Sequence, residues 1–522
     1  DLGASTISGT LGITSVGAIS DTGVVAVAGT TTLDNSGGTN AAILLDSAST
    51  FTGNVIFTTD TGSDVTITDN SDFAIQSGLN VNNLSITSTG SVTDLGNIDI
   101  DGTLTVSAAG QTIDLSGTGN DLTGVVNLTG AAVTLVDTTA TSIAGITATG
   151  ALSVTSGGTI TQTGAIDADL ASSFTAGANA ITLSNASNDF SGAVSLSNSG
   201  TNDVSLTDVN ALDLGTVSVG QNLTVTAAGA ISDTGVVTVA GTTTLDNSGG
   251  TNAAILLNSE STYTGNVTFT TDTGSDVTIT DNSDFAIQSG LNVNNLSITS
   301  TGSVTDLGNI DIDGTLTVSA AGQTIDLSGT GNDLTGVVNL TGAAVTLVDT
   351  TATSIAGITA TGALSVTSGG TITQTGAIDA DLASSFTAGA NAITLSNASN
   401  DFSGAVSLSN SGTNDVSLTD VNALDLGTVS VGQNLTVTTG GALTDSGAIT
   451  VGSLATLVST GQSVTLGDST TANFGSLDFA GAAVSIKEGS SMEIAASEAT
   501  GVLTLEASGA ITQTGAIDAD LA

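Results

Sequence analysis

The chain of 522 residues carries 48 acidic residues and a single basic one, Lys487, so its net charge at pH 7 is −47. This balance argues against nucleic acids and anionic membrane surfaces as partners, because both are bound through clusters of Lys and Arg. The chain has no Cys, which removes any disulfide framework, and it also lacks His, Pro and Trp.

Hydrophobic residues make up 39% of the chain, mostly Ala, Val, Ile and Leu, so simple disorder is not expected. No apolar run approaches the ~18 residues of a transmembrane helix, and we expect no membrane span in this segment. The chain opens on DLGASTISGT, which has neither the basic nor the apolar region of a secretory signal peptide.

Three copies of one long repeat follow one another from the N-terminus, each opening on Asp-Leu-Gly. They span 1–212, 213–424 and, as a partial copy, 425–522. Residues 57–212 recur without change at 269–424. Because the chain begins and ends in mid-pattern, we interpret 1–522 as one continuous β-solenoid and as a fragment of a longer repeat array.

Each long repeat divides into three subunits of about 70 residues, marked by a Leu-x-Val/Ile-Thr segment or a close variant. The marking leucines are Leu11, Leu84, Leu152, Leu223, Leu296, Leu364, Leu435 and Leu503. Several strand-like cores lie within each subunit. Their spacing predicts three coils per subunit and about 24 residues per coil, which is within the range of solenoid periods.

The strand-like cores alternate apolar and polar residues. In LTVT (223–226), Leu223 and Val225 point one way and the threonines the other, as in a half-buried strand. Gly, Asn, Asp and Ser separate the cores and favour tight turns. The absence of Pro fits a fold in which nearly every N–H joins a ladder. The sequence therefore predicts an all-β chain folded as a parallel β-helix.

Two further signals recur once per subunit: an aromatic residue or Leu before a Gly turn, and a strand that ends in an acid. The aromatic residues Phe51, Phe190, Tyr263, Phe402 and Phe474 share a phase. We expect them inside as a broken ladder, with a sugar-stacking surface as the alternative. Asp69, Asp137 and Asp208 also share a phase, which we interpret as charges ~14 Å apart, beyond a Debye length.

Two short segments resemble metal sites. SGTGND (116–121) looks like a calcium loop, but it occurs once per long repeat, so we expect it to close a coil and deliver Leu122 to the core. NIDIDG (97–102) begins like an EF-hand, but its twelfth position is Ala108, and Ile98 and Ile100 suit a strand. No ligand set stands out, so we predict no metal or cofactor site and leave weak surface Ca²⁺ binding open.

Catalysis is not expected, because β-helix enzymes that cleave polysaccharides use Lys, Arg, His or paired acids, and nearly every Asp of the first copy recurs in the second. We predict no catalytic residues. Outward Thr pairs such as Thr66 and Thr68 suggest an ice- or mineral-binding face, but the pairs do not recur in every coil. We expect Lys487 to form a solvated pair with Glu488.

Segments such as LTVTAAGAISDTGVVTVAGTTTLD (223–246) and ANAITLSNASNDFSGAVSLSN (178–198) resemble the repeats of filamentous-haemagglutinin-like and autotransporter-passenger bacterial surface adhesins. The resemblance implies a right-handed β-helix, secretion by a two-partner or type V route, and a place on the bacterial cell surface. It implies the structural shaft of a large fibre that attaches to host cells, neighbouring cells or matrix through regions outside this fragment.

Two other functions stay open at this point. One is a self-assembling extracellular filament or surface-layer protein, stabilised by cations and held together by end-to-end or lateral contacts between copies. The other, more remote, is a polysaccharide-active β-helix enzyme.

Overall fold

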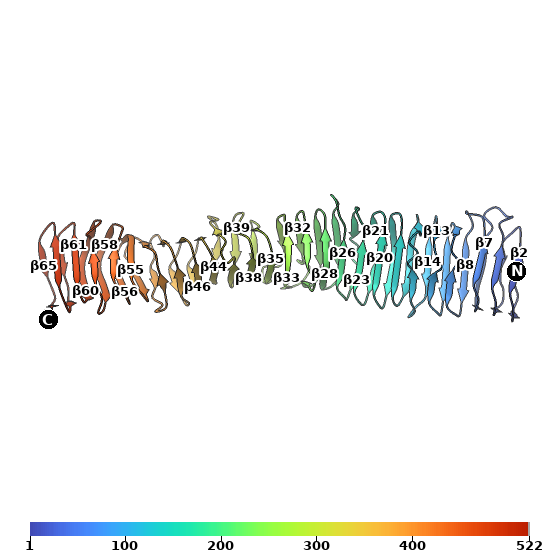
Figure 1. The fold of residues 1–522 in the computed structure, drawn as a ribbon, viewed down its shortest axis with the longest axis horizontal. Coiled ribbons are helices and arrows are strands. Elements are labelled where there is room, and N and C mark those ends of the chain that lie inside the picture. The colour runs from blue at the N-terminus through green and yellow to red at the C-terminus, as the bar shows by residue number, and fades with distance from the viewer. Residues whose placement is uncertain (520–522) are drawn as a thin grey trace. The chain divides into compact units, whose positions relative to one another are not determined.

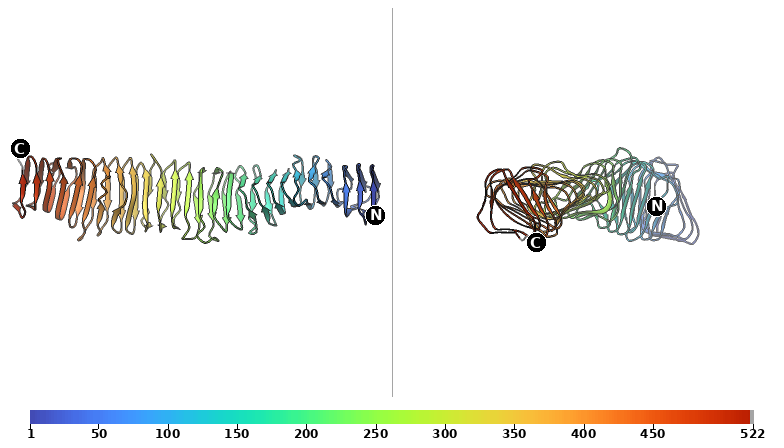
Figure 2. Two further views of the ribbon diagram at one scale, coloured as in Figure 1. Left: turned by 90° about the horizontal axis from the view of Figure 1, so that it is seen from below. Right: turned by 60° about the vertical axis from the view of Figure 1, so that its left-hand side comes forward.

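The computed structural model describes residues 1–519, and all secondary structure in them is β-strand (Figure 1). The chain divides into two compact units, Asp1–Asp272 and a second that begins at Thr273. In both units the strands lie side by side in parallel stacks, as Figure 2 shows from two further directions. The prediction of an all-β parallel solenoid is confirmed, and right-handed coiling stays a prediction.

A coil of the first unit holds three short strands joined by tight corners. One coil consists of β8 (Val65–Asp69), β9 (Phe73–Ile75) and β10 (Leu79–Val81), and the next of β11 (Leu84–Ser88), β12 (Val92–Asp94) and β13 (Ile98–Ile100). Each strand pairs in parallel with its equivalent one coil later: Val65 with Leu84, Phe73 with Val92, and Leu79 with Ile98. All three pairings join residues the same number of positions apart, so every strand of this coil advances by one coil length to its partner.

Coil length varies along the chain and averages less than predicted. The interval from Leu84 to its partner Leu104 is shorter than the interval from Ile19 to its partner Ile43. The two units together comprise about 26 turns, and coils of the predicted length would give fewer. The prediction was too long because it took successive prominent strand cores as successive coils. Val194 pairs with Leu214 one coil later, whereas Leu223, taken as the start of the next coil, belongs to another stack and pairs with Val204.

The core of each unit is built from the inward residues of the alternating strands. Leu223 and Val225 of β29 (Leu223–Ala227) are buried, whereas Thr224 is exposed, as the alternation predicts. Some corners are tightly stacked on the coil before them. A Cβ added at Gly124 would lie 1.7 Å from the carbonyl oxygen of Gly102 one coil earlier, so stacking at this corner requires glycine.

The second unit repeats these pairings and then changes where the sequence drifts. β35 (Val277–Asp281) pairs with β38 (Leu296–Ser300) in the register of β8 with β11. In the third copy β58 (Ile449–Ser459) and β60 (Ala472–Gly481) are the longest neighbours and pair over most of their length. Sequence drift has therefore lengthened strands without breaking the parallel stack.

The aromatic residues expected inside are buried, with Phe51, Phe190 and Phe402 at 2% exposure or less. Their burial rules out the alternative of a sugar-stacking surface. The rings of Phe190 and Phe402 contact Phe174 and Phe386, respectively, at centroid distances of 6.0 Å and nearly at right angles. Phe190 and Phe402 therefore pack against a phenylalanine of the preceding coil, in isolated edge-to-face pairs, instead of against each other.

Candidate functional site: buried carboxylates that close the coils

The two signals that recur in each subunit meet in the structure. The acid at the end of one strand accepts a hydrogen bond from the backbone N–H of the aromatic residue or Leu in the preceding coil. The pairs are Phe51 with Asp69 (2.9 Å), Leu122 with Asp137 (3.2 Å), Phe190 with Asp208 (3.3 Å), Leu334 with Asp349 (3.2 Å), Phe402 with Asp420 (3.1 Å) and Phe474 with Glu488 (3.0 Å). We call these six acids the capping carboxylates.

The capping carboxylates correct the interpretation of Asp69, Asp137 and Asp208 as charges held apart in solvent. All three are buried, at 0–2% exposure. Each lies where a short strand ends at a corner and an inward N–H has no carbonyl of the next coil to bond. A buried N–H without an acceptor is costly, so the carboxylate takes the place of the absent carbonyl.

At Asp69 a serine completes the cap. The hydroxyl of Ser71 lies 3.0 Å and 3.1 Å from the two carboxylate oxygens, while the Phe51 N–H donates to Oδ1. Burial raises the pKa of Asp69 to about 6, and the hydrogen bonds from Phe51 and Ser71 pull it in the opposite direction. Removal of the carboxylate from water therefore outweighs its hydrogen bonds.

At Asp208 the cap is incomplete. The N–H of Phe190 donates to Oδ1, but no hydrogen bond of normal geometry reaches the buried Oδ2. Burial raises the pKa of Asp208 to about 6, the N–H groups of Phe190, Asn210 and Val209 lower it, and repulsion from Asp189 adds to the rise. Asp420 repeats this arrangement with Phe402 and Asp401, and burial likewise raises its pKa to about 6.

At Asp137 both carboxylate oxygens are fully used. Oδ1 accepts from the N–H groups of Leu122 and Thr139 and from the Thr139 hydroxyl, and Oδ2 accepts from the buried hydroxyl of Thr141 at 2.9 Å. Asp349 has the same set of donors in the second unit. The same backbone position thus holds a saturated carboxylate in one subunit and an under-bonded one in the next.

The third copy uses a longer acid for the same purpose. Glu488 is 1% exposed and accepts from the N–H of Phe474 and the hydroxyl of Ser490, and burial raises its pKa. The prediction that Lys487 pairs with Glu488 is wrong. Lys487 lies 3.5 Å from Glu506 of the next coil, and both side chains are more than half exposed.

The SGTGND segment closes a coil, as predicted, and does so through Asn120. This side chain is fully buried; it accepts from the N–H of Ile98 and donates to Asp94, which also accepts from the N–H of Gly117. Leu122 follows with 1% exposure. Sequence reasoning did not single out Asn120. Its position directly before the short strand β16 (Asp121–Leu122) is the signal that would have found it.

Acids also stack on the outside in adjacent coils. Asp99 of β13 pairs in register with Asp121 of β16, and the amide of Asn80 donates to Asp99. Burial raises the pKa of Asp99, and repulsion from Asp101 and Asp121 adds to the rise. Residues 97–102 form strand, as expected from Ile98 and Ile100. Within residues 1–519, no group of three or more acids is arranged to hold a metal ion.

Uncharged hydroxyls form long columns on the outer faces. On one face of the first unit, six successive coils place a hydroxyl in register, and none of the six residues is buried. The column consists of Thr155, Thr175, Ser197, Ser218, Thr238 and Thr262. Single hydroxyls therefore recur in every coil of this stretch, although the Thr pairs noted in the sequence do not.

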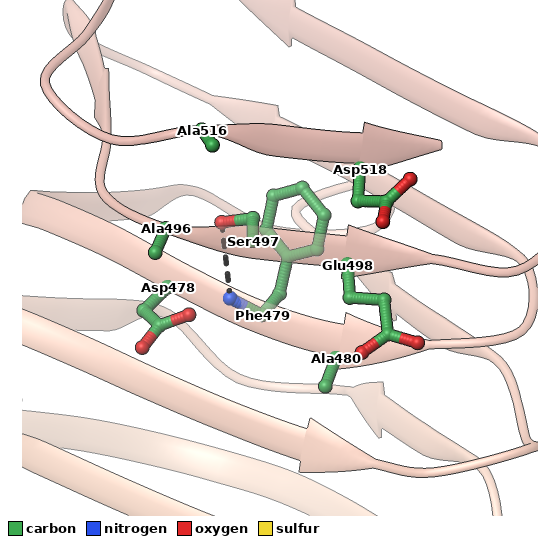
Figure 3. A pocket seen from close by; sticks show the side chains of 8 residues that line it. All are labelled: Asp478, Phe479, Ala480, Ala496, Ser497, Glu498, Ala516 and Asp518. Atoms are coloured by element: carbon green, nitrogen blue, oxygen red, sulfur yellow. Dashed lines mark hydrogen bonds between the residues drawn. The ribbon is translucent and has the colours of Figure 1, made fainter. Parts of the chain in front are cut away.

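A hollow of about 370 Å³ lies in the third copy around Phe479 (Figure 3). Asp478, Glu498 and Asp518 line it from three neighbouring strands, and the N–H of Phe479 donates to Ser497 at 3.3 Å. Burial raises the pKa of Asp478. Its lining contains carboxylates but no Lys, so acid–base chemistry there would rest on carboxyl groups alone.

No helix suited to crossing a membrane is found in residues 1–519. No curated protein and no solved structure matches the chain. The family model DUF5649, described as repeats of unknown function, matches eight successive segments. They are 1–58, 62–129, 130–197, 201–270, 274–341, 342–409, 413–478 and 481–520. Most of them agree in length with the predicted subunit, and together they cover nearly the whole chain. The chain therefore belongs to the DUF5649 family of repeats.

Proposed function

We propose that this chain is a non-catalytic structural shaft within a large secreted fibre or adhesin of the bacterial cell surface. The observation that carries the proposal is that a buried carboxylate of the same kind closes a turn in six of the subunits. A unit of this kind can be added or removed without disturbing a unique site. The unchanged recurrence of residues 57–212 at 269–424 fits such addition.

The composition supports the same proposal. The sequence has no Arg or His, and its single Lys lies in an exposed ion pair. Buried polar groups such as Asp137 and Asn120 are used to close turns, which leaves them unavailable to a substrate. Attachment to host cells, neighbouring cells or matrix is then a property of other parts of the fibre.

The test is electron microscopy of the native cell surface and of the isolated protein with and without residues 213–424. One long repeat holds about ten coils, so its removal should shorten an isolated rod by about 50 Å at ~4.8 Å per coil. Labelling of intact cells with an antibody tests surface display. A deletion variant of unchanged length, or a chain retained inside the cell, would contradict the proposal.

A second candidate is a self-assembling extracellular filament or surface layer. The hydroxyl columns favour it, because two chains with a net charge of −47 each must meet through uncharged strips or through bridging cations. Indefinite filaments or lateral bundles that form on addition of Ca²⁺ and dissolve with a chelator would support it. Isolated spikes of fixed length favour the shaft.

The remote alternative of a polysaccharide-active enzyme has a specific place to be tested, the hollow around Phe479. Asp478 precedes Phe479 there, whereas Thr268 precedes the corresponding Phe269 of the second copy, so this acidic group is not part of the repeat. Release of oligosaccharides from a panel of polysaccharides by the unsubstituted protein, and its loss in Glu498→Gln, would replace the structural proposal.

A further inference from the structure

We propose that Asp69, Asp208 and Asp420, here called the trio, form a proton-operated brace: each takes up a proton in mildly acidic solution and thereby strengthens the coil it closes. This inference does not depend on the proposed function. It rests on where three carboxylates lie, what bonds they make, and which charges surround them.

The first step is burial without a counter-charge. Each member of the trio is 0–2% exposed. A buried carboxylate is normally paired with a cation, because removing its charge from water is costly. Lys487 is the only basic side chain in the sequence, and it pairs with Glu506 on the surface. No basic side chain is therefore present to neutralise the trio.

The second step is the shortage of donors. Asp208 and Asp420 each use one oxygen for a Phe N–H, and the other oxygen is buried without a hydrogen bond of normal geometry. At Asp69 the one hydroxyl of Ser71 is shared by both oxygens, and the N–H groups of Phe51, Ser71 and Asn70 supply the remaining contacts. An ionised carboxylate offers about four acceptor positions, so the charged form is poorly satisfied at Asp208 and Asp420, and at Asp69 its two oxygens share one hydroxyl proton.

The third step is the neighbouring charge. The strands that pair with β27 (Val204–Asp208) carry no titratable side chain, and the charge facing Asp208 is Asp189 of β25 (Asp189–Phe190). Asp420 on β54 (Val416–Asp420) faces Asp401 in the same way. For Asp69, β6 (Ile43–Phe51) carries the exposed Asp46 and β11 carries no acid. The negative charges that face Asp208 and Asp420 favour the protonated form, whereas at Asp69 burial alone raises the pKa.

The direction of the effect follows from the pKa values. Burial raises the pKa of each trio member to about 6, against 3.8 for an ordinary Asp. The folded chain then holds more protons than the unfolded chain between these two values. The added stability is fully present below about pH 4 and is lost as the pH rises through about 6. At pH 5 each site takes up about 0.8 proton on folding.

Potentiometric titration of the folded and the urea-unfolded full chain measures this uptake directly. The triple variant Asp69→Asn, Asp208→Asn, Asp420→Asn should lose about 2.5 protons of the folded-minus-unfolded difference at pH 5. The matched control is Asp64→Asn, Asp203→Asn, Asp415→Asn, which removes the same number of charges at exposed positions and should retain the uptake. Retention of the uptake by the trio variant would overturn the proposal.

A second measurement on the unsubstituted protein covers the case in which the trio variant does not fold. The midpoint of thermal unfolding should be several degrees higher at pH 5 than at pH 7.5, and the rise should persist in 1 M NaCl. Salt at about that concentration screens repulsion between exposed charges but acts weakly on buried ones. A midpoint that falls on acidification, or a rise that salt abolishes, would contradict the brace.

Discussion

The turn closed by Asp137 and the turn closed by Asp208 occupy equivalent places in successive subunits, yet their carboxylates are bonded differently. Asp137 accepts from two N–H groups and two hydroxyls, whereas Asp208 accepts from the N–H of Phe190 and leaves an oxygen buried and unbonded. The residue four positions after the acid makes part of the difference, since it is Thr141 in one turn and the buried Leu212 in the other. The same backbone position can therefore hold a fully hydrogen-bonded carboxylate, as at Asp137, or an under-bonded carboxylate with a raised pKa, as at Asp208.

The largest expected effect comes from removing the saturated carboxylate. Asp137→Ala leaves the Leu122 N–H and the Thr141 hydroxyl buried without an acceptor, and should lower the local free energy of opening by about 3 kcal/mol. Asp208→Ala should cost only about 1 kcal/mol at pH 7.5, because it also removes an unpaired buried charge. Hydrogen exchange measured by mass spectrometry on the full chain tests both.

The duplication supplies the control for that experiment. Residues 57–212 and 269–424 are identical, so the unsubstituted turn at Asp349 reports on the same molecule, and the mass difference separates the two peptides. Equal losses in the two alanine variants would remove the distinction between the turns.

The next effect concerns pH. Exchange at the Phe190 N–H, corrected for its intrinsic pH dependence, should indicate an opening free energy higher by about 1–2 kcal/mol at pH 5 than at pH 7.5. The sign follows from a pKa of about 6 for Asp208 in the folded chain, above the value of 3.8 expected when unfolded. Asp208→Asn is the control, in which this site's contribution should disappear. A turn that opens more easily at pH 5 would show that the carboxylate stabilises it as an anion.

A smaller effect is expected from making the turn at Asp137 resemble the turn at Asp208. Thr141→Val removes the only donor to Oδ2 of Asp137 and keeps the side-chain volume, so the turn should lose about 1 kcal/mol at pH 7.5. The untouched Thr353 turn in the same molecule is the reference. No change in exchange at Leu122 would mean that the hydroxyl adds nothing to the cap.

The smallest effect is expected from removing Lys487, which pairs with the carboxylate of Glu506 on the surface. Lys487→Gln breaks the exposed pair with Glu506 and should change stability by less than about 0.5 kcal/mol. Thermal unfolding of the variant at low and high salt provides the measurement. A large loss of stability would show that exposed ion pairs contribute as much as the buried capping carboxylates. The difference between Asp137 and Asp208 would then not be the main source of variation in stability along the chain.

Much of the fold could be predicted from the sequence because the repeat and the alternation are physical signatures of stacked parallel strands. Leu223 and Val225 are buried and Thr224 is exposed, as the pattern requires. The coil length was overestimated because the pattern does not show which stack a strand core belongs to: Val194 and Leu223 were taken as one coil apart, but Val194 pairs with Leu214 and Leu223 with Val204.

The caps could not be predicted for a different reason. Both halves of each cap were visible, as a Gly turn after an aromatic residue and as a strand ending in an acid. Asp is almost never fully buried without a partner, so its burial was not expected. The partner is a backbone N–H, which leaves no mark in the sequence. Lys487 was assigned to Glu488 for a related reason, since neighbours along a strand point to opposite sides and true partners lie one coil away.

The isolation of Lys487 has a consequence for the proteolysis of this chain. A trypsin-like protease cuts after Lys or Arg, so the bond between Lys487 and Glu488 is the single one it can attack in 522 residues. That bond lies in β61 (Val484–Glu488), hydrogen-bonded to β64 (Leu503–Ala507), with Glu488 turned inward. Cleavage would require the strand to be pulled out of its stack into the protease cleft. We therefore expect the folded chain to resist cleavage by trypsin-like proteases.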